Sequence, residues 1–269
     1  MNARLEAVLT DLTAESEQLD AWISGSTEED AWRLNTPAAG WTVAHQIAHL
    51  LWTDEASVLA ITDPAAFGGL LRDAASRPDT FVDDGAAARA TLAPDELLKR
   101  WRAGRMALAG ALRGCPDDMR IPWYGPPMAP TSMATARMME TWAHAHDVAA
   151  AMGVDVPRTD RARHVAFLGV RTRGFAHQVN GIAPPTEEFR VELTGPSGEV
   201  WSWGPEDAEQ RVTGDGWDFA LLVTRRLHRE DADLVATGED AERWLGIAQA
   251  FAGPPGAEPR RREERSVSA

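Results

Sequence analysis

The sequence is poor in residue types that would point to particular classes of protein. Among 269 residues it has a single cysteine, Cys115, and a single tyrosine, Tyr124. One cysteine excludes an internal disulfide and a zinc site built from a cysteine cluster. The fold therefore does not depend on an oxidising compartment.

Long apolar runs and an excess of positive charge are also lacking. No stretch approaches the roughly 20 apolar residues that a membrane span needs, and the N-terminus lacks the basic and apolar parts of a secretion signal. Lys and Arg number 27 against 41 Asp and Glu, a formal net charge of −14, so a phosphate backbone or an anionic membrane is repelled. We therefore expect a cytoplasmic monomer or homodimer that binds neither nucleic acid nor membranes.

Four long helices are predicted in the first half of the chain. Residues 3–24 carry apolar side chains at spacings of three and four, the pattern of an amphipathic helix. Further helices are expected at 43–61, at 94–112 and at 132–152, each ending near Gly or Pro. Four helices of about 20 residues joined by loops are typical of a bundle.

The pattern changes after Pro157, where short alternating segments join the helices. Residues 189–193 and 200–203 alternate in polarity around a Gly-Pro-Ser-Gly turn, which predicts a hairpin. The helices expected in this part of the chain are at 161–174, 218–227 and 239–251. Together these elements indicate a small α+β domain.

The fold class that follows is α+β, with two domains and a tail. A four-helix bundle is predicted for residues 1–156 and a smaller α+β domain for 157–253. Residues 254–269 are polar and aperiodic, and we expect them to be disordered.

Residues on the predicted helix 132–152 could carry chemistry. Its sequence METWAHAHD covers positions 139–147. At about 100° per residue, Glu140 and His144 lie about 40° apart, and Asp147 falls about 20° to the other side of Glu140. His146 points to the opposite side. A Glu and a His one turn apart are components of a metal site in a bundle core.

A third metal ligand would have to come from another helix, and the helix 43–61 offers two. His45 and His49 are four residues apart on a face away from the main aliphatic stripe. Pairs at this spacing also occur as solvated neighbours without a metal. The spacing alone leaves both possibilities open, and it leaves the choice between the two histidines open as well.

These motifs resemble a known family. The segments that carry the resemblance are GWTVAHQIAHL at 40–50, METWAH with Asp147 at 139–147, VWSWGPED at 200–207 and QAFAG at 249–253. They are similar to the DinB-like family of actinobacteria that includes mycothiol-dependent maleylpyruvate isomerase, and closest to a metal-binding subgroup of it. The resemblance covers almost all of the chain except the tail.

The resemblance implies a DinB-like bundle that holds a divalent metal, most often zinc. Carried over by position, the ligands are His49, Glu140 and His144. It further implies a C-terminal domain similar to the sterol-carrier fold, and mycothiol as the thiol cofactor. Two imidazoles and one carboxylate leave a coordination position open, the pattern of a catalytic rather than a structural zinc site.

The function expected from this pattern is that of a metal-dependent enzyme. It would use a low-molecular-weight thiol, mycothiol, to transfer to or isomerise a small electrophilic substrate, because a metal-bound thiol loses its proton near neutral pH. One alternative is a hydrolase or lyase in which the metal activates water. Another is a non-catalytic module that binds a metal or a ligand. The sequence does not identify the catalytic residues.

Several other residues are candidates for supporting roles. Arg225 and Arg226 belong to a cationic cluster that could bind the carboxylates of an acidic substrate or of a thiol cofactor, and Arg137 could do the same. A solvated helix end is the favoured alternative for all three. The aromatic loop 123–127 could line a pocket near the metal or close the end of the bundle. Asp54 is expected either to be buried and paired or to mark the end of the bundle.

Overall fold

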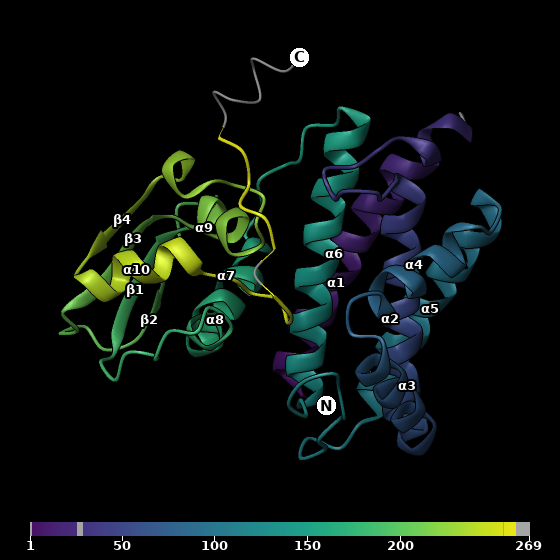
Figure 1. Cartoon of the computed structure of the whole chain (residues 1–269), viewed down its shortest axis with the longest axis horizontal. Coiled ribbons are helices and arrows are strands. Elements are labelled where there is room, and N and C mark those ends of the chain that lie inside the picture. Colours follow the sequence, from purple (N-terminus) through teal and green to yellow (C-terminus); the bar gives the residue numbers. More distant parts are fainter. Residues whose placement is uncertain (1, 26–28, 255, 262–269) are drawn as a thin grey trace. The chain divides into compact units, whose positions relative to one another are not determined.

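The protein is α+β, as the sequence predicts. A computed structural model describes residues 2–25, 29–254 and 256–261, and the chain divides into two units, Met1–Val156 and Pro157–Ala269. Helices form the first unit, and the second combines helices with a four-stranded sheet (Figure 1).

The four long helices predicted for the first unit are all present. They are α1 (Ala3–Ser24), α2 (Val43–Thr62), α5 (Pro94–Gly114) and α6 (Pro130–Met152). The local sequence explains their ends. Asn2 caps α1 by accepting hydrogen bonds from the backbone N–H groups of Arg4 and Leu5, and α5 and α6 each begin with a proline. Helix α6 ends at Gly153, whose φ of 66° is left-handed.

The first unit also contains helical segments that the sequence analysis did not predict. These are η1 (Glu29–Arg33), α3 (Pro64–Ser76) and α4 (Phe81–Ala90). The sequence Thr-Asp-Pro at 62–64 ends α2 as expected, but Asp63 also caps α3 by accepting a hydrogen bond from Ala66 N at 3.0 Å. Helix α4 packs so closely on α2 that a Cβ at Gly85 would lie only 2.7 Å from the Trp52 ring.

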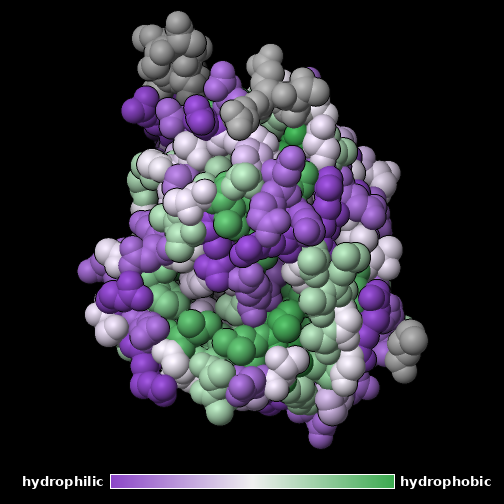
Figure 2. Space-filling model, turned by 90° about the vertical axis from the view of Figure 1, so that its right-hand side faces the viewer, coloured by the Kyte–Doolittle hydropathy of each residue, from purple (hydrophilic) through white to green (hydrophobic). Residues whose placement is uncertain are grey.

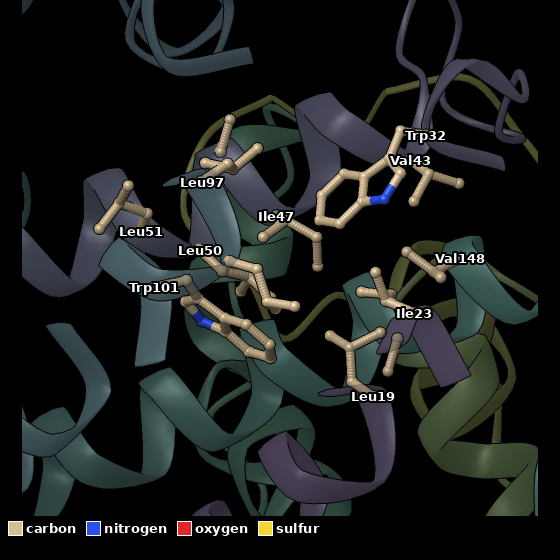
Figure 3. Close-up of a cluster of buried hydrophobic side chains, with 13 residues drawn as sticks. Leu19, Ile23, Trp32, Val43, Ile47, Leu50, Leu51, Leu97, Trp101 and Val148 are labelled. Carbon is tan, nitrogen blue, oxygen red and sulfur yellow. The ribbon is translucent and has the colours of Figure 1, made fainter. Parts of the chain in front are cut away.

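A buried apolar cluster holds α2 in place among the other long helices (Figure 3). Ile47 and Leu50 from α2 are fully buried there, beside Leu97 and Trp101 from α5. Each such side chain contributes about 1.5–3 kcal/mol through burial. Since α2 also carries His45 and His49, this packing fixes the position of both histidines.

The second unit is built on a mixed sheet with the strand order β2-β1-β3-β4. Strands β1 and β2 form the predicted antiparallel hairpin, whereas β1 and β3 run parallel and β3 and β4 antiparallel. The strands are β1 (Phe189–Thr194), β2 (Val200–Trp203), β3 (Gln210–Asp215) and β4 (Leu234–Thr237). The sequence analysis did not predict β3 or β4.

The helices of the second unit are shorter than the sequence predicts. The expected helix at 161–174 is divided at Thr172, and the one at 218–227 ends at Val223 because Arg225 has a positive φ of 61°. The helical segments are α7 (Ala162–Arg171), α8 (Arg173–Val179), α9 (Gly216–Val223), η2 (Arg229–Asp231) and α10 (Glu239–Ile247).

The described part of the predicted tail has neither helix nor strand, and it is not free of contacts. Glu258 lies 3.2 Å from His228, and Arg261 lies 2.5 Å from Glu230. Position 255 and positions 262–269 lie outside the described residues, so the disorder expected for the tail stays a prediction.

The large apolar side chains lie mainly inside the two units. Figure 2 shows a face on which hydrophilic residues predominate, with hydrophobic residues gathered in its lower half. Within the described ranges, the large apolar residues that are exposed come from separate elements: Leu34, Val82, Met106, Val200 and Val235. No described helix is both long and apolar enough to cross a membrane.

Candidate metal centre

Helices α2 and α6 lie in contact and bring the three expected ligands together (Figure 1). The Nε2 atom of His49 is 3.7 Å from a carboxylate oxygen of Glu140. The ring centres of His49 and His144 are 4.6 Å apart. The imidazole of His49 thus shares one small region of the first unit with the carboxylate of Glu140 and the imidazole of His144, which follow it by about 90 residues in the sequence.

A buried glutamine orients His144. Gln46 is fully buried on α2 and donates a hydrogen bond from its amide nitrogen to Thr36 Oγ1 at 2.8 Å. Its carbonyl oxygen therefore faces His144 and accepts from the Nδ1–H of that ring. This arrangement leaves the lone pair on Nε2 of His144. A partner on the second nitrogen is the usual feature of a metal-binding histidine.

The carboxylate of Glu140 is held by a buried arginine. Arg137 lies one turn before Glu140 on α6, is 1% exposed and forms an ion pair with it. Burial raises the pKa of Glu140, but the charge of Arg137 and the neighbouring His49 side chain outweigh burial and bring the pKa to about 2. Glu140 is therefore ionised at neutral pH.

Arg137 also pairs with Asp54, which corrects the two roles expected for this arginine. Its Nε atom donates to Asp54 Oδ1 at 3.1 Å, and its guanidinium also donates to the Leu50 carbonyl. The prediction of a substrate-binding cation or a solvated helix end is wrong for Arg137, because its guanidinium is buried and pairs with Asp54 and Glu140 inside the bundle. Asp54 is buried and paired, one of the two possibilities expected, and burial raises its pKa to about 6 although Arg137 lowers it.

Tryptophans border the two histidines. The ring of Trp41 stacks on His144 at 6.0 Å between centres and lies 5.4 Å from His49. Its Nε1–H donates to Asp83 at 2.9 Å, which fixes the ring. Trp52 contacts His49 from α2 at 5.7 Å. No role for Trp41 is predicted from the sequence, although its place directly before the N-cap of α2 is a signal.

The aromatic loop 123–127 is linked to the histidines by the ring of Trp52, which contacts both Tyr124 and His49. Trp123 stacks on Phe67 of α3 at 5.7 Å, and Tyr124 contacts Trp52 at 6.2 Å between ring centres. Burial raises the pKa of Tyr124 to about 12, so its hydroxyl is neutral. These contacts place the loop against aromatic residues of α2 and α3. Both expected roles of the loop, lining a pocket near the metal and closing the end of the bundle, stay predictions.

The other two histidines of α2 and α6, His45 and His146, make hydrogen bonds to residues three or four positions away in the sequence. The Nδ1 atom of His45 lies 2.9 Å from the Thr42 hydroxyl and accepts from the Thr42 backbone N–H, which completes the cap of α2. His146 makes a hydrogen bond with the Trp142 carbonyl at 2.7 Å. Asp147 is buried. Neither His45 nor His146 contacts His49, Glu140 or His144 through these hydrogen bonds.

The two arginines expected to bind a cofactor lie in the second unit, just after α9. Arg225 is half-buried, and burial lowers its pKa, while Arg226 donates to the Thr224 carbonyl. These contacts are local. Cofactor binding by Arg225 and Arg226 stays a prediction.

The donor chemistry of the site fits a divalent metal. Two imidazoles and a carboxylate suit zinc, and Nδ1 of His49 is buried without a hydrogen-bond partner among the described residues. In their present positions, however, no three His, Cys, Asp or Glu side chains of the described chain are arranged as a metal site. The three expected ligands lie near one another, and Arg137 pairs with the carboxylate of Glu140.

Comparison with known protein families matches residues 12–149, just over half of the chain, to the mycothiol maleylpyruvate isomerase N-terminal domain. The chain belongs to this family. The match includes all of α2 and most of α6, and so contains His49, Glu140 and His144. A separate match, to a family described as wyosine base formation, covers residues 185–237 in the second unit.

Similar proteins extend the relationship over most of the chain. Uncharacterised proteins from two strains of Mycobacterium tuberculosis, CDC 1551 / Oshkosh and ATCC 25618 / H37Rv, are each 55% identical over 248 residues. Each alignment covers 92% of this chain and 96% of the relative. The crystal structure of the mycothiol-dependent maleylpyruvate isomerase matches with a TM-score of 0.56 at 19% identity, covering 88% of this chain and 95% of that one. That similarity shows the shared fold.

Proposed function

We propose that this member of the family is a cytoplasmic metalloenzyme that uses mycothiol to transfer to or isomerise a small electrophilic substrate. The observation that carries the proposal is the convergence of His49, Glu140 and His144 between α2 and α6. The family relationship supports the choice of thiol, because the N-terminal domain family and the matching crystal structure are both named for a mycothiol-dependent isomerase.

In this proposal His49, Glu140 and His144 hold one divalent ion, most readily zinc. A zinc ion with two imidazoles and one carboxylate supplies an open coordination position at which the pKa of a thiol falls below its ordinary value. Arg137 keeps Glu140 ionised, and Gln46 keeps the lone pair of His144 on Nε2. Trp41 and Trp52 border the histidines with apolar rings, which reduce the access of water.

Metal content tests the ligand set. Purified protein should carry about one divalent ion per chain, and His49→Ala, His144→Ala and Glu140→Gln should each lose most of it, because two ligands form a weak site. Glutamine preserves the shape at position 140, and circular dichroism checks that each variant is folded. Elemental analysis measures the ion.

His146→Ala is the matched control, since His146 bonds the Trp142 carbonyl on the same helix. It should retain the metal. Full occupancy in all three ligand variants would contradict the site, whatever the activity of the protein.

Cobalt substitution tests whether a thiol reaches the metal. Added mycothiol should produce a thiolate-to-cobalt absorption and release one proton per thiol bound, because the thiol must ionise well below its usual pKa of about 8.5. Glutathione should bind more weakly if the site recognises mycothiol. Turnover with no thiol and no change in the cobalt spectrum would replace this proposal by activation of water.

A further inference from the structure

The second unit has a cavity of its own. It has a volume of about 410 Å³ and is lined only by residues of α7, of α8, of the hairpin strands and of the adjoining turns. This volume lies within the range of about 300–1,000 Å³ that is usual for small-molecule sites. None of its lining residues belongs to the histidine site, which lies in the first unit.

The walls of the cavity are partly aromatic. Phe167 and Val170 come from α7, Phe189 from the start of β1, and Trp203 from the end of β2. Phe189 is 4% exposed, so little of its ring is open to a ligand, and the other three are half-buried. Such a combination of rings suits a ligand with a flat apolar body.

Two arginines and one glutamate line this cavity. The lining includes Arg171, Arg173 and Glu188. The guanidinium carbon of Arg173 lies 3.9 Å from the centre of the Phe189 ring, which holds this cation against the wall. Within the described residues, the Arg171 guanidinium makes no hydrogen bond or ion pair. The local charge is thus about +1 in a chain with a formal net charge of −14.

Two glycines shape the cavity in opposite ways. Gly204 has a φ of +83°, and a Cβ there would lie 1.9 Å from the Phe189 carbonyl oxygen, so only glycine allows this close approach. Gly174, on α8, has no heavy atom within 4 Å of the place that a Cβ would take. A side chain added at Gly174 therefore enters open space at the cavity without meeting the wall.

We infer that this cavity binds a small monocarboxylate with a flat, apolar body. The ring would lie between Phe167 and Trp203, beside the Arg173 guanidinium that covers Phe189. The carboxylate would accept hydrogen bonds from the Arg171 fork, the geometry that guanidinium groups favour. Glu188 offsets one of the two positive charges, so a single negative charge fits the cavity better than the two charges of a phosphate monoester.

Calorimetry with 2-naphthoate, 2-naphthamide and 2-naphthyl phosphate tests this inference. The three probes share a ring system and differ in charge. The carboxylate should bind about tenfold more tightly than the amide, because hydrogen bonds to charged groups are the stronger ones. The carboxylate should also bind more tightly than the phosphate. Equal affinity for all three probes, or no binding of 2-naphthoate at millimolar concentration, would overturn it.

Variants locate the binding. Arg171→Gln should weaken 2-naphthoate about tenfold and leave 2-naphthamide unchanged, whereas Gly174→Leu should abolish the binding of both. The matched controls are Arg72→Gln, an exposed arginine on α3, and Gly246→Leu on α10, where a Cβ would also face open space. Neither control should change the affinity, and thermal melting checks the fold of each variant.

The histidine site could also attract a carboxylate if it holds a metal, so the titrations use metal-free protein with chelator present. The inference requires that His49→Ala binds 2-naphthoate as the native chain does. Loss of binding in His49→Ala together with retention in Gly174→Leu would overturn it. Failure of the metal proposal would leave these expectations unchanged, because they involve only the second unit.

Discussion

Two clusters of arginine and carboxylate in the first unit have opposite compositions. Between α1 and α5, one carboxylate, Asp20, is shared by Arg102 and Arg105. Between α2 and α6, one arginine, Arg137, is shared by Asp54 and Glu140. The residue types are the same, and the ratio of positive to negative charge is reversed.

The pKa of the aspartate differs between the clusters accordingly. Burial raises the pKa of Asp20, but Arg102, Ser24 and Arg105 together bring it below its ordinary value. Burial raises the pKa of Asp54 to about 6, because Arg137 lowers it only in part and Glu140 raises it further. Pairing with arginine thus does not by itself keep a buried carboxylate ionised; the number of cations per carboxylate and the access of water decide it.

The comparison also distinguishes a structural cluster from one suited to a cation. With both acids ionised, the Arg137 cluster has a charge of −1 and lies beside two imidazoles, whereas the Asp20 cluster has a charge of +1. A negative charge beside imidazole nitrogens favours a divalent metal, which supports the site proposed between α2 and α6.

The largest effect expected is that of Arg137→Met. Arg137 is buried and pairs with both carboxylates, of which Asp54 is also buried, so its removal should lower the free energy of unfolding by about 3–5 kcal/mol. Urea denaturation of the metal-free protein measures it. A loss below about 1 kcal/mol would mean that water reaches Asp54 and Glu140 and that the two clusters do not differ.

The second prediction concerns pH and compares Asp54→Asn with Asp20→Asn. The folded state holds the Asp54 proton more tightly than the unfolded state, so the stability that this group contributes is present below its ordinary pKa of 3.8 and is lost as the pH rises through about 6. The stability of the native chain relative to Asp54→Asn should therefore fall, by an amount on the order of 3 kcal/mol, between pH 4 and pH 7.

Asp20 should behave in the opposite way. Its pKa is lowered in the folded state, so its contribution is present above 3.8 and is lost as the pH falls. Unfolding by urea, with chelator present, at several pH values measures both variants. The same sign of pH dependence for the two variants would contradict the comparison.

The smallest effect expected is that of Arg102→Met. Its side chain is 45% exposed, and Arg105 remains at 2.7 Å from Asp20, so the loss of stability should be about 1 kcal/mol or less. It should shrink further when the salt concentration is raised. A loss as large as that of Arg137→Met would show that exposure does not separate the clusters.

Much of the first unit could be predicted from sequence patterns, and less of the second. The helices α1, α2, α5 and α6 were found because apolar spacing and capping residues are local signals. Helices α3 and α4 are short and were not predicted. Strands β3 and β4 were also missed, because β3 pairs in parallel with β1 through Val191 and Val212, far apart in the sequence.

The sequence by itself determined the long helices and the hairpin, because each depends on the spacing of nearby residues. The three candidate ligands came from the family resemblance, since the spacing alone left both His45 and His49 open. Only the tertiary structure decided which partners those ligands have. Arg137 and Asp54 are 83 positions apart, and Gln46 and His144 are 98 apart. Such pairs form only when the apolar packing of α2 against the other helices brings them together, and the burial that results sets the pKa values of Glu140 and Asp54.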